Sequence, residues 1–193
     1  MKRLCVFTGS SPGARPEYAR AAQNLAGAIV ERELTLIFGG SRQGLMGILA
    51  DSVMEAGGEV IGVIPDRLFP KETPHMGLTE LHVVKSMHER KQVMADLSDG
   101  FIAMPGGVGT LEELTEIYTW SQLGLHRKPC GLLNVEGYYD YLTQFLDHAV
   151  HERFLKPIHR DTLMVKEDPR ELLDEFATYR APRLGKWLDR AST

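Results

Sequence analysis

Short apolar runs alternate along the chain with longer segments in which apolar residues recur every three or four positions. A short apolar run bounded by turn formers is typical of a buried strand, and the wider spacing indicates a helix with one buried face. The pattern predicts strands at residues 4–8, 34–38, 59–64, 81–84, 101–104, 130–134 and, at a sheet edge, 162–165. It predicts helices at residues 16–33, 44–56, 87–97, 111–123, 138–152 and 170–177.

The alternation of strands and helices predicts the fold class. Repeated strand–helix–strand units make right-handed crossovers, which give a mostly parallel sheet covered by helices on both faces. We therefore expect an α/β fold of the Rossmann-like, doubly wound kind. The 193 residues fit a single domain spanning residues 1–193. From about residue 181 onward the pattern fades, so we expect a flexible tail there despite Trp187.

Composition and charge narrow the class of protein. Hydrophobic residues make up 43% of the chain and charged residues 25%, as in globular proteins, and the net charge of −4 offers no basic footprint for nucleic acid or an anionic membrane. We see no leader and no apolar run near the roughly 20 residues that cross a bilayer, so we expect a cytoplasmic protein without nucleic-acid or membrane partners. Cys5 and Cys130 fall in predicted strands, where we expect reduced core residues.

Glycine-rich turns follow three of the predicted strands, at residues 9–13, 39–47 and 105–109. In a parallel sheet these turns share the carboxyl edge, where doubly wound folds bind ligands. A single glycine turn means little, but three at one edge predict a nucleotide pocket. From these turns we expect contributions to the substrate site by Ser10, Ser11, Gly40, Gly44 and Gly106.

The stretch from Pro105 to Glu113 places a glycine turn against paired carboxylates. It joins a predicted strand to a predicted helix, so the first N–H groups of the helix can bind a phosphate that the glycines allow to approach closely. The same residues also fit a capping box, in which Thr110 caps the helix and Glu113 reaches back to the cap. A cap needs no run of glycines, so we favour a phosphate cradle beside a catalytic acid.

The absence of two nucleotide-binding motifs narrows the choice of nucleotide further. No turn matches the G-x-G-x-x-G fingerprint, and the second strand ends in Gly39 and Gly40 rather than in the acid that holds a dinucleotide ribose. The Lys-Ser/Thr pair of a Walker A loop is also missing from the second turn. A monophosphate therefore fits better than NAD or a magnesium-bound triphosphate.

Arg90 is a candidate cation for that monophosphate, because it shares a helix face with the apolar Met87 and Met94. It is either half of a structural ion pair with a carboxylate at the edge of the core, or a bidentate ligand of phosphate or sugar. Lys91 projects about 100 degrees away and is either solvated or a ligand contact. We predict no metal site, since His148 and His151 lack zinc-helix spacing and a third ligand.

Four motifs resemble those of the Lonely guy (LOG) family in order and spacing. They are Gly9-Ser10-Ser11; Gly39-Gly40 with Gly44-Leu45-Met46-Gly47; Met87-His88-x-Arg90-Lys91; and Pro105-Gly106-Gly107-x-Gly109-Thr110-x-x-Glu113. The family comprises cytokinin riboside 5'-monophosphate phosphoribohydrolases, often mislabelled lysine decarboxylases. The resemblance implies a Rossmann-like homodimer with active sites at the subunit interface. It also implies hydrolysis of the N-glycosidic bond of adenosine 5'-monophosphates, often N6-substituted, to ribose 5-phosphate and free base.

The resemblance further implies roles for single residues. By motif position, Arg90 and Glu113 are the catalytic pair. The implied substrate contacts are Glu72, Lys91, Gly107, Val108, Gly109, Thr110, Leu111, Glu112 and Thr119. Two positions depart from the family pattern: Thr8 stands where a Cys is common, and Ser41 replaces a frequent third glycine.

The residue types suit such a reaction. Breaking an N-glycosidic bond builds positive charge on the ribose, which a carboxylate such as that of Glu113 stabilises. Arg90 would anchor the nucleotide or assist the leaving base through its charge, because an arginine is a poor proton donor. No metal or organic cofactor is required, and we find no motif for a pyridoxal-binding lysine. The alternative function is a nucleotide or cofactor carrier that binds without turnover.

Overall fold

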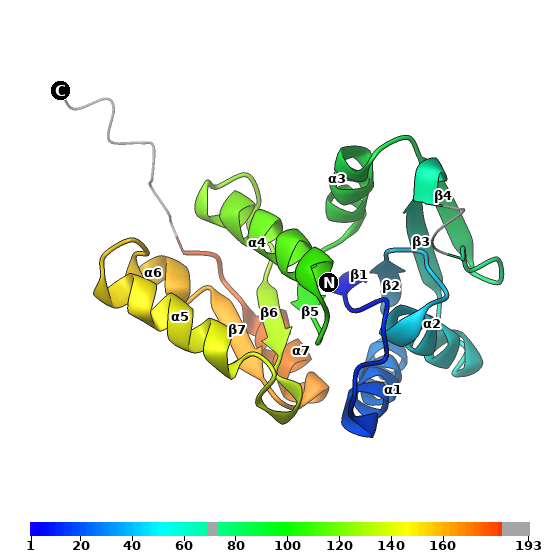
Figure 1. The fold of residues 1–193 in the computed structure, drawn as a ribbon, viewed down its shortest axis with the longest axis horizontal. Coiled ribbons are helices and arrows are strands. Elements are labelled where there is room, and N and C mark those ends of the chain that lie inside the picture. The colour runs from blue at the N-terminus through cyan, green and yellow to red at the C-terminus, as the bar shows by residue number, and fades with distance from the viewer. Residues whose placement is uncertain (69–72, 183–193) are drawn as a thin grey trace.

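The structure, a computed structural model, describes residues 1–68 and 73–182. In this part of the chain seven strands form one sheet in the order β4-β3-β2-β1-β5-β6-β7, and every pair of neighbours is parallel. Figure 1 shows the helices packed around this sheet. The predicted Rossmann-like α/β fold is confirmed.

The elements follow the predicted alternation closely. The strands are β1 (Arg3–Phe7), β2 (Thr35–Phe38), β3 (Val60–Pro65), β4 (Glu80–Val84), β5 (Gly100–Ala103), β6 (Cys130–Leu133) and β7 (Leu163–Lys166). The helices are α1 (Pro16–Glu31), α2 (Gly44–Glu55), α3 (Met87–Leu97), α4 (Val108–Gln122), α5 (Asp140–His151), α6 (Pro157–Arg160) and α7 (Pro169–Thr178). Two 3-10 turns, η1 (Asp66–Leu68) and η2 (Val135–Gly137), follow β3 and β6.

The hydrophobic core lies in two layers, one on each face of the sheet. Successive side chains of a strand point to opposite faces, and β1 shows the consequence. Leu4 and Val6 pack in the layer that contains α1, α2 and α7, whereas Cys5 and Phe7 pack in the layer that contains α3 and α4. Both cysteines are buried free thiols, as expected, and burial raises the pKa of Cys130 to about 12.

The order of the strands reverses at β1. From this strand the chain runs outward through β2, β3 and β4 on one side, and through β5, β6 and β7 on the other. Phe7 pairs with Ala103, so β1 and β5 end side by side. The carboxyl ends of these two strands form the crevice where such folds bind ligands.

Some boundaries differ from the predictions. Helix α4 begins at Val108, three residues earlier than expected, and α6 was not predicted because its four residues are too short to show a period. The predicted edge strand is present as β7. Trp187 and the tail beyond residue 182 lie outside the described residues, so the expected flexible tail stays a prediction.

Two properties of the described residues concern function. None of the helices there has both the length and the apolar character needed to cross a membrane. Within residues 1–68 and 73–182, no group of His, Cys, Asp and Glu side chains is arranged to hold a metal ion.

Candidate functional site

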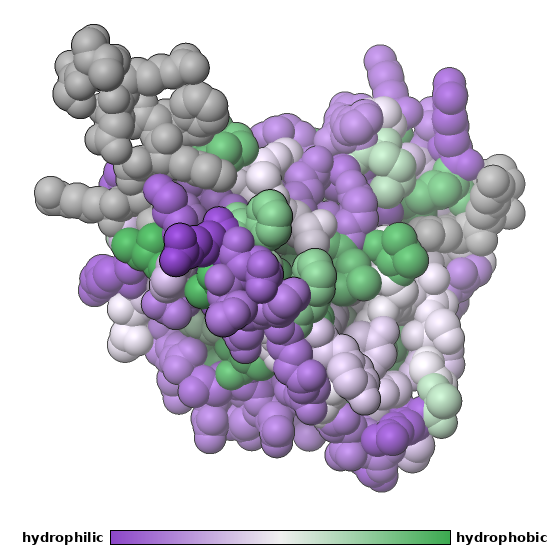
Figure 2. Space-filling model, turned by 60° about the vertical axis from the view of Figure 1, so that its left-hand side comes forward, coloured by the Kyte–Doolittle hydropathy of each residue, from purple (hydrophilic) through white to green (hydrophobic). Residues whose placement is uncertain are grey.

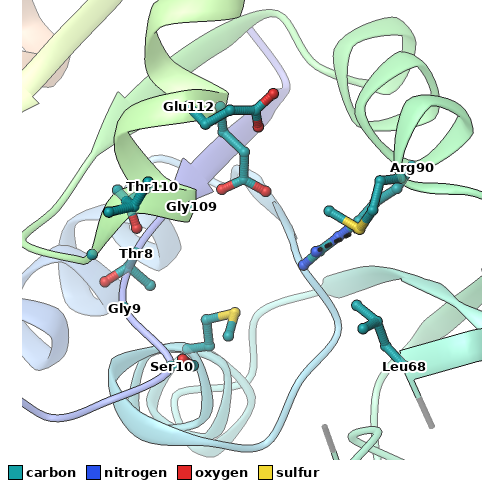
Figure 3. A pocket seen from close by; sticks show the side chains of 13 residues that line it. Thr8, Gly9, Ser10, Leu68, Arg90, Gly109, Thr110 and Glu112 are labelled. Atoms are coloured by element: carbon teal, nitrogen blue, oxygen red, sulfur yellow. Dashed lines mark hydrogen bonds between the residues drawn. The ribbon is translucent and has the colours of Figure 1, made fainter. Parts of the chain in front are cut away.

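A cavity of about 420 Å³ opens at the carboxyl ends of β1 and β5. Figure 3 shows it from close by, with Arg90 on one side and Gly109, Thr110 and Glu112 on the other. Its described lining residues are Thr8, Gly9, Ser10, Met46, Leu68, Met87, Arg90, Gly107, Val108, Gly109, Thr110, Glu112 and Glu113. The structure therefore brings together both members of the expected catalytic pair and the glycine turn between β5 and α4.

The turn after β5 packs directly against the turn after β1. The carbonyl of Pro105 accepts hydrogen bonds from the backbone N–H of Gly9 and from Oγ1 of Thr8, both at 3.2 Å. A Cβ at residue 106 would lie 2.1 Å from Oγ1 of Thr110 and 2.8 Å from the nitrogen of Gly9. Gly106 is therefore a glycine because the two turns meet there, although it does not itself line the cavity.

Helix α4 presents its first turn to the cavity. Its first hydrogen bond runs from the N–H of Leu111 to the carbonyl of Gly107, at 3.2 Å, so the amides of the three preceding residues have no carbonyl partner within the helix. The cap residue Gly107 offers no side chain to these amides. Val108, Gly109 and Thr110 all line the cavity. The helix dipole and these N–H groups together favour an anion at this position.

The capping-box interpretation of the same residues is wrong. Because α4 begins at Val108, Thr110 is the third residue of the helix rather than its cap. A related cap occurs instead on α3, where Oγ of Ser86 accepts the N–H of Glu89 at 3.1 Å and Oε2 of Glu89 accepts the N–H of Lys85 at 2.7 Å. Glu113 is half-buried and lines the cavity.

Glu113 also lies close enough to β1 to affect Cys5. Burial raises the pKa of the Cys5 thiol well above its usual value, and the nearby charge of Glu113 raises it further. A negative charge at this depth suits the stabilisation of a developing cation.

Arg90 is held by main-chain carbonyls of β3 and of the turn after β2. Its side chain is buried, with only 5% of the residue exposed, yet it lines the cavity. Nε donates to the carbonyl of Val63 at 3.1 Å, and Nη2 donates to the carbonyl of Gly39 at 2.9 Å. These two main-chain acceptors hold the guanidinium plane in one orientation and leave other N–H donors for a ligand.

Lys91 is held between two carboxylates of α4, and its expected contact with the substrate stays a prediction. It is 8% exposed and is not among the described lining residues. Its Nζ forms ion pairs with Glu112 and, at 3.0 Å, with Glu116, so it ties α3 to α4. Burial lowers the pKa of Lys91, but the hydrogen bonds and charges of the two carboxylates outweigh that effect, and the net pKa is raised. The prediction of a solvated lysine is therefore wrong.

The glycine turn after β2 packs closely against the turn after β1. Gly44 has a φ of +57°, and a Cβ there would lie 2.3 Å from the carbonyl carbon of Ser10. The N–H of Leu45 donates to the carbonyl of Gly9 at 3.1 Å. Of the serines and glycines expected from the first two turns, Ser10 lines the cavity, whereas Ser11, Gly40 and Gly44 are not among its described lining residues.

The remaining expected contacts are not in the described lining. Leu111 packs against the core, and Thr119 is exposed, with its Oγ1 donating to the carbonyl of Thr115 at 2.7 Å. Glu72 lies outside the described residues. Sequence reasoning did not assign Leu68, which follows β3 in η1 and carries no recognisable signal, or Met46 and Met87, which lie within the quoted motifs.

Comparisons with known proteins place the chain in a family. The sequence model of a family described as "Possible lysine decarboxylase" matches residues 46–176. The Arabidopsis thaliana protein named cytokinin riboside 5'-monophosphate phosphoribohydrolase LOG7 is 48% identical over 92% of this chain and 82% of its own length. A second Arabidopsis thaliana protein of that name, LOG5, is 50% identical over 93% of this chain and 78% of its own length.

Solved structures of more distant proteins share the fold. The molybdenum cofactor carrier protein of Chlamydomonas reinhardtii superimposes with a TM-score of 0.69 at 19% identity, covering 92% of this chain and 99% of that one. That degree of identity shows a common architecture only. The two Arabidopsis relatives are far more similar in sequence. The chain therefore belongs to the Lonely guy family, whose named members are cytokinin riboside 5'-monophosphate phosphoribohydrolases.

Proposed function

We propose that this protein hydrolyses the N-glycosidic bond of adenosine 5'-monophosphates, including N6-substituted ones, to the free base and ribose 5-phosphate. The observation that carries the proposal is that one cavity is lined by Arg90, Glu113 and the glycine-rich start of α4. The names of the relatives point to the same reaction.

The start of α4 is the proposed phosphate site. The amides of Val108, Gly109 and Thr110 have no carbonyl partner within the helix, and the glycine on either side of Val108 lets an anion approach the backbone. With a net charge of −4, the protein has no general attraction for anions, so this local site has to supply the binding.

Glu113 is the proposed catalytic carboxylate. When the bond between the anomeric carbon and the base nitrogen breaks, its electrons leave with the base, which takes up a proton, and the ribose becomes an oxocarbenium-like cation. The Glu113 carboxylate stabilises that cation and orients the water whose oxygen bonds to the anomeric carbon. The proton that this water loses balances the proton that the base takes up. Arg90 holds the nucleotide from the opposite side through a guanidinium that its carbonyl partners keep in place.

The residues of the cavity do not fit the decarboxylase description of the family model. Such chemistry requires a lysine amine that binds pyridoxal phosphate. The described lining contains no lysine, and Lys91 in the adjacent motif is held by Glu112 and Glu116.

A homodimer with active sites at the subunit interface is part of the proposal. Val108 at the start of α4 is 83% exposed, and Leu125 beyond its end is 69% exposed. Figure 2 shows hydrophobic residues at the surface among larger hydrophilic areas. Light scattering of the purified protein tests the dimer, and a mass equal to one chain contradicts it. We also propose a cytoplasmic location, supported by the two buried free thiols.

The experiment that tests the activity is a panel of nucleoside 5'-monophosphates incubated with the protein. We expect free base and ribose 5-phosphate, in equal amounts, from adenosine monophosphate or its N6-isopentenyl derivative. Chromatography of the base and a colour assay for the reducing sugar measure the two products. If both nucleotides bind and neither releases base, the protein is a carrier and the proposed function is wrong.

A further inference from the structure

Two adjacent tyrosines support the phosphate turn from outside the cavity. Tyr138 and Tyr139 follow η2 and lie far from Pro105 in the sequence. Oη of Tyr139 donates to the carbonyl of Met104 at 2.6 Å, and Oη of Tyr138 donates to the carbonyl of Gly106 at 2.5 Å. Neither tyrosine lines the cavity.

The carbonyl of Pro105, which lies between those of Met104 and Gly106, also accepts hydrogen bonds. Pro105 accepts from Gly9 and Thr8, as described above. Three successive carbonyls, those of residues 104 to 106, therefore each have a specific donor, and the donors come from two different parts of the chain. A turn made largely of glycine is flexible by itself, so these hydrogen bonds determine how its peptide planes face.

The hydrogen bond to Gly106 has a direct effect on the next amide. The described residues contain no cis peptide bond, and in a trans peptide the C=O and N–H groups point in opposite directions. The carbonyl of Gly106 points to Tyr138, which is outside the cavity, so the N–H of Gly107 points the other way. Gly107 lines the cavity.

Packing holds that peptide on one side only, because Gly106 lies against the turn after β1 and Gly107 does not. A Cβ at Gly107 would meet no atom within 4 Å, so the residue stands in open space. If the peptide between Gly106 and Gly107 turned over, a carbonyl oxygen would face the phosphate and repel it. Tyr138 is well placed to prevent this rotation, because its ring packs edge-on against Tyr18 and Tyr139, with centroids 5.8 and 5.1 Å away.

We infer that Tyr138 is a positioning residue for phosphate binding. Its hydroxyl fixes the peptide between Gly106 and Gly107 with the N–H group toward the ligand, while Tyr139 fixes the preceding carbonyl at Met104. The inference rests on the proposed function, because it assigns the anion at this turn to the 5'-phosphate of the substrate.

The test is the substitution Tyr138→Phe, which keeps the packed ring and removes only the hydroxyl. We expect KM for adenosine monophosphate to rise about 3- to 10-fold, the range that corresponds to one hydrogen bond, with kcat changed less than about twofold. The inhibition constant of inorganic phosphate rises by a similar factor. The matched control is Tyr141→Phe, which removes a hydroxyl from a ring that is 84% exposed and leaves both constants unchanged.

A binding experiment separates failure of this inference from failure of the proposed function. In spectra of the ¹⁵N-labelled protein, inorganic phosphate shifts the amide signals of Gly107 and Gly109 in the unsubstituted protein, and Tyr138→Phe requires more phosphate for the same shift. This result stands whether or not base is released. Equal phosphate affinity in the two proteins overturns the inference, as does a loss of thermal stability or of kcat with KM and phosphate affinity unchanged.

Discussion

Nη2 of Arg90 lies 2.9 Å from the carbonyl oxygen of Gly39, in space that a side chain at residue 39 would fill. A Cβ added at Gly39 would stand 1.9 Å from that nitrogen. Gly39 thus supports Arg90 in two ways, by accepting its hydrogen bond and by having no side chain.

The substitution Gly39→Ala is therefore expected to displace the guanidinium. The end of an arginine side chain can move, so the fold survives with a loss of about 1–3 kcal/mol in unfolding free energy. Activity suffers more, because a shift of about 1 Å in a positioned group can cost 10²-fold in rate. Denaturant unfolding and initial rates of base release measure the two effects.

Gly27→Ala is the matched control for this prediction. Gly27 lies in α1, and a Cβ there would meet no atom within 4 Å. Alanine in a helix is favoured over glycine by about 0.5–1 kcal/mol, so this variant gains stability and keeps its activity. If Gly39→Ala were as active as Gly27→Ala, the position of Arg90 would not matter for turnover.

Glu113→Gln removes the proposed catalytic charge with little change of shape. We expect kcat to fall about 10²- to 10³-fold, as when a group that stabilises transition-state charge is lost. Glu55→Gln is the control, since Glu55 ends α2, which begins near the cavity and runs away from it. A Glu113→Gln protein that is both folded and fully active would refute the assignment.

Lys91→Met tests the link between α3 and α4. The substitution leaves the Glu112 and Glu116 carboxylates facing each other without their cation. Glu112 is half exposed, so water screens part of the cost, and we expect unfolding free energy to fall by about 1–3 kcal/mol. Adding Glu116→Gln to this variant should restore part of the loss. Additive losses in the double variant would contradict the ion-pair explanation.

His126 predicts a dependence of stability on pH. Its Nε2 bonds to the carbonyl of Ile117 at 2.9 Å, and its Nδ1 accepts the N–H of Lys128 at 3.1 Å, an arrangement that requires the neutral ring. Burial, together with the charge of Lys128, lowers the pKa of His126 below 6.5, although the bond to Ile117 opposes the change. The unfolded chain therefore takes up the proton first as the pH falls.

The contribution of His126 to the free energy of unfolding is complete above about pH 6.5. It is lost as the pH falls toward the lower pKa that His126 has in the folded protein. We expect unfolding free energy to decrease between pH 7.5 and 5, and to decrease less in His126→Gln, whose side chain can still donate and accept. Urea unfolding at several pH values measures the difference. Equal slopes for the two proteins would show that His126 titrates alike in both states.

The strands and most helices could be predicted because a buried parallel sheet leaves clear apolar runs in the sequence. The start of α4 could not be predicted, because Gly109 has a low helix propensity and the sequence around it is typical of a loop. In the structure the chain turns into the helix at Gly107, and the turn before it is held by Tyr138, which lies 32 residues from its partner Gly106.

The sequence predicts those site residues whose position follows from their own motif. It does not predict those whose position depends on a neighbouring helix or strand. Helical spacing placed Arg90 on the face that reaches the cavity. The partners of Lys91 required knowledge that α3 lies beside α4, which the spacing of a single helix does not contain. Leu68 reaches the cavity only because β3 ends near it.

The contact between Gly44 and Ser10 limits how this enzyme family member can diversify. Residue 44 cannot gain a side chain without displacing the turn after β1, because a methyl group there already collides with the backbone of Ser10. Leu68 and the 41%-exposed Met87 line the cavity outside these two turns, so they can vary without disturbing this contact. An engineer seeking a new base preference would randomise those two positions and leave the interlocked glycines untouched.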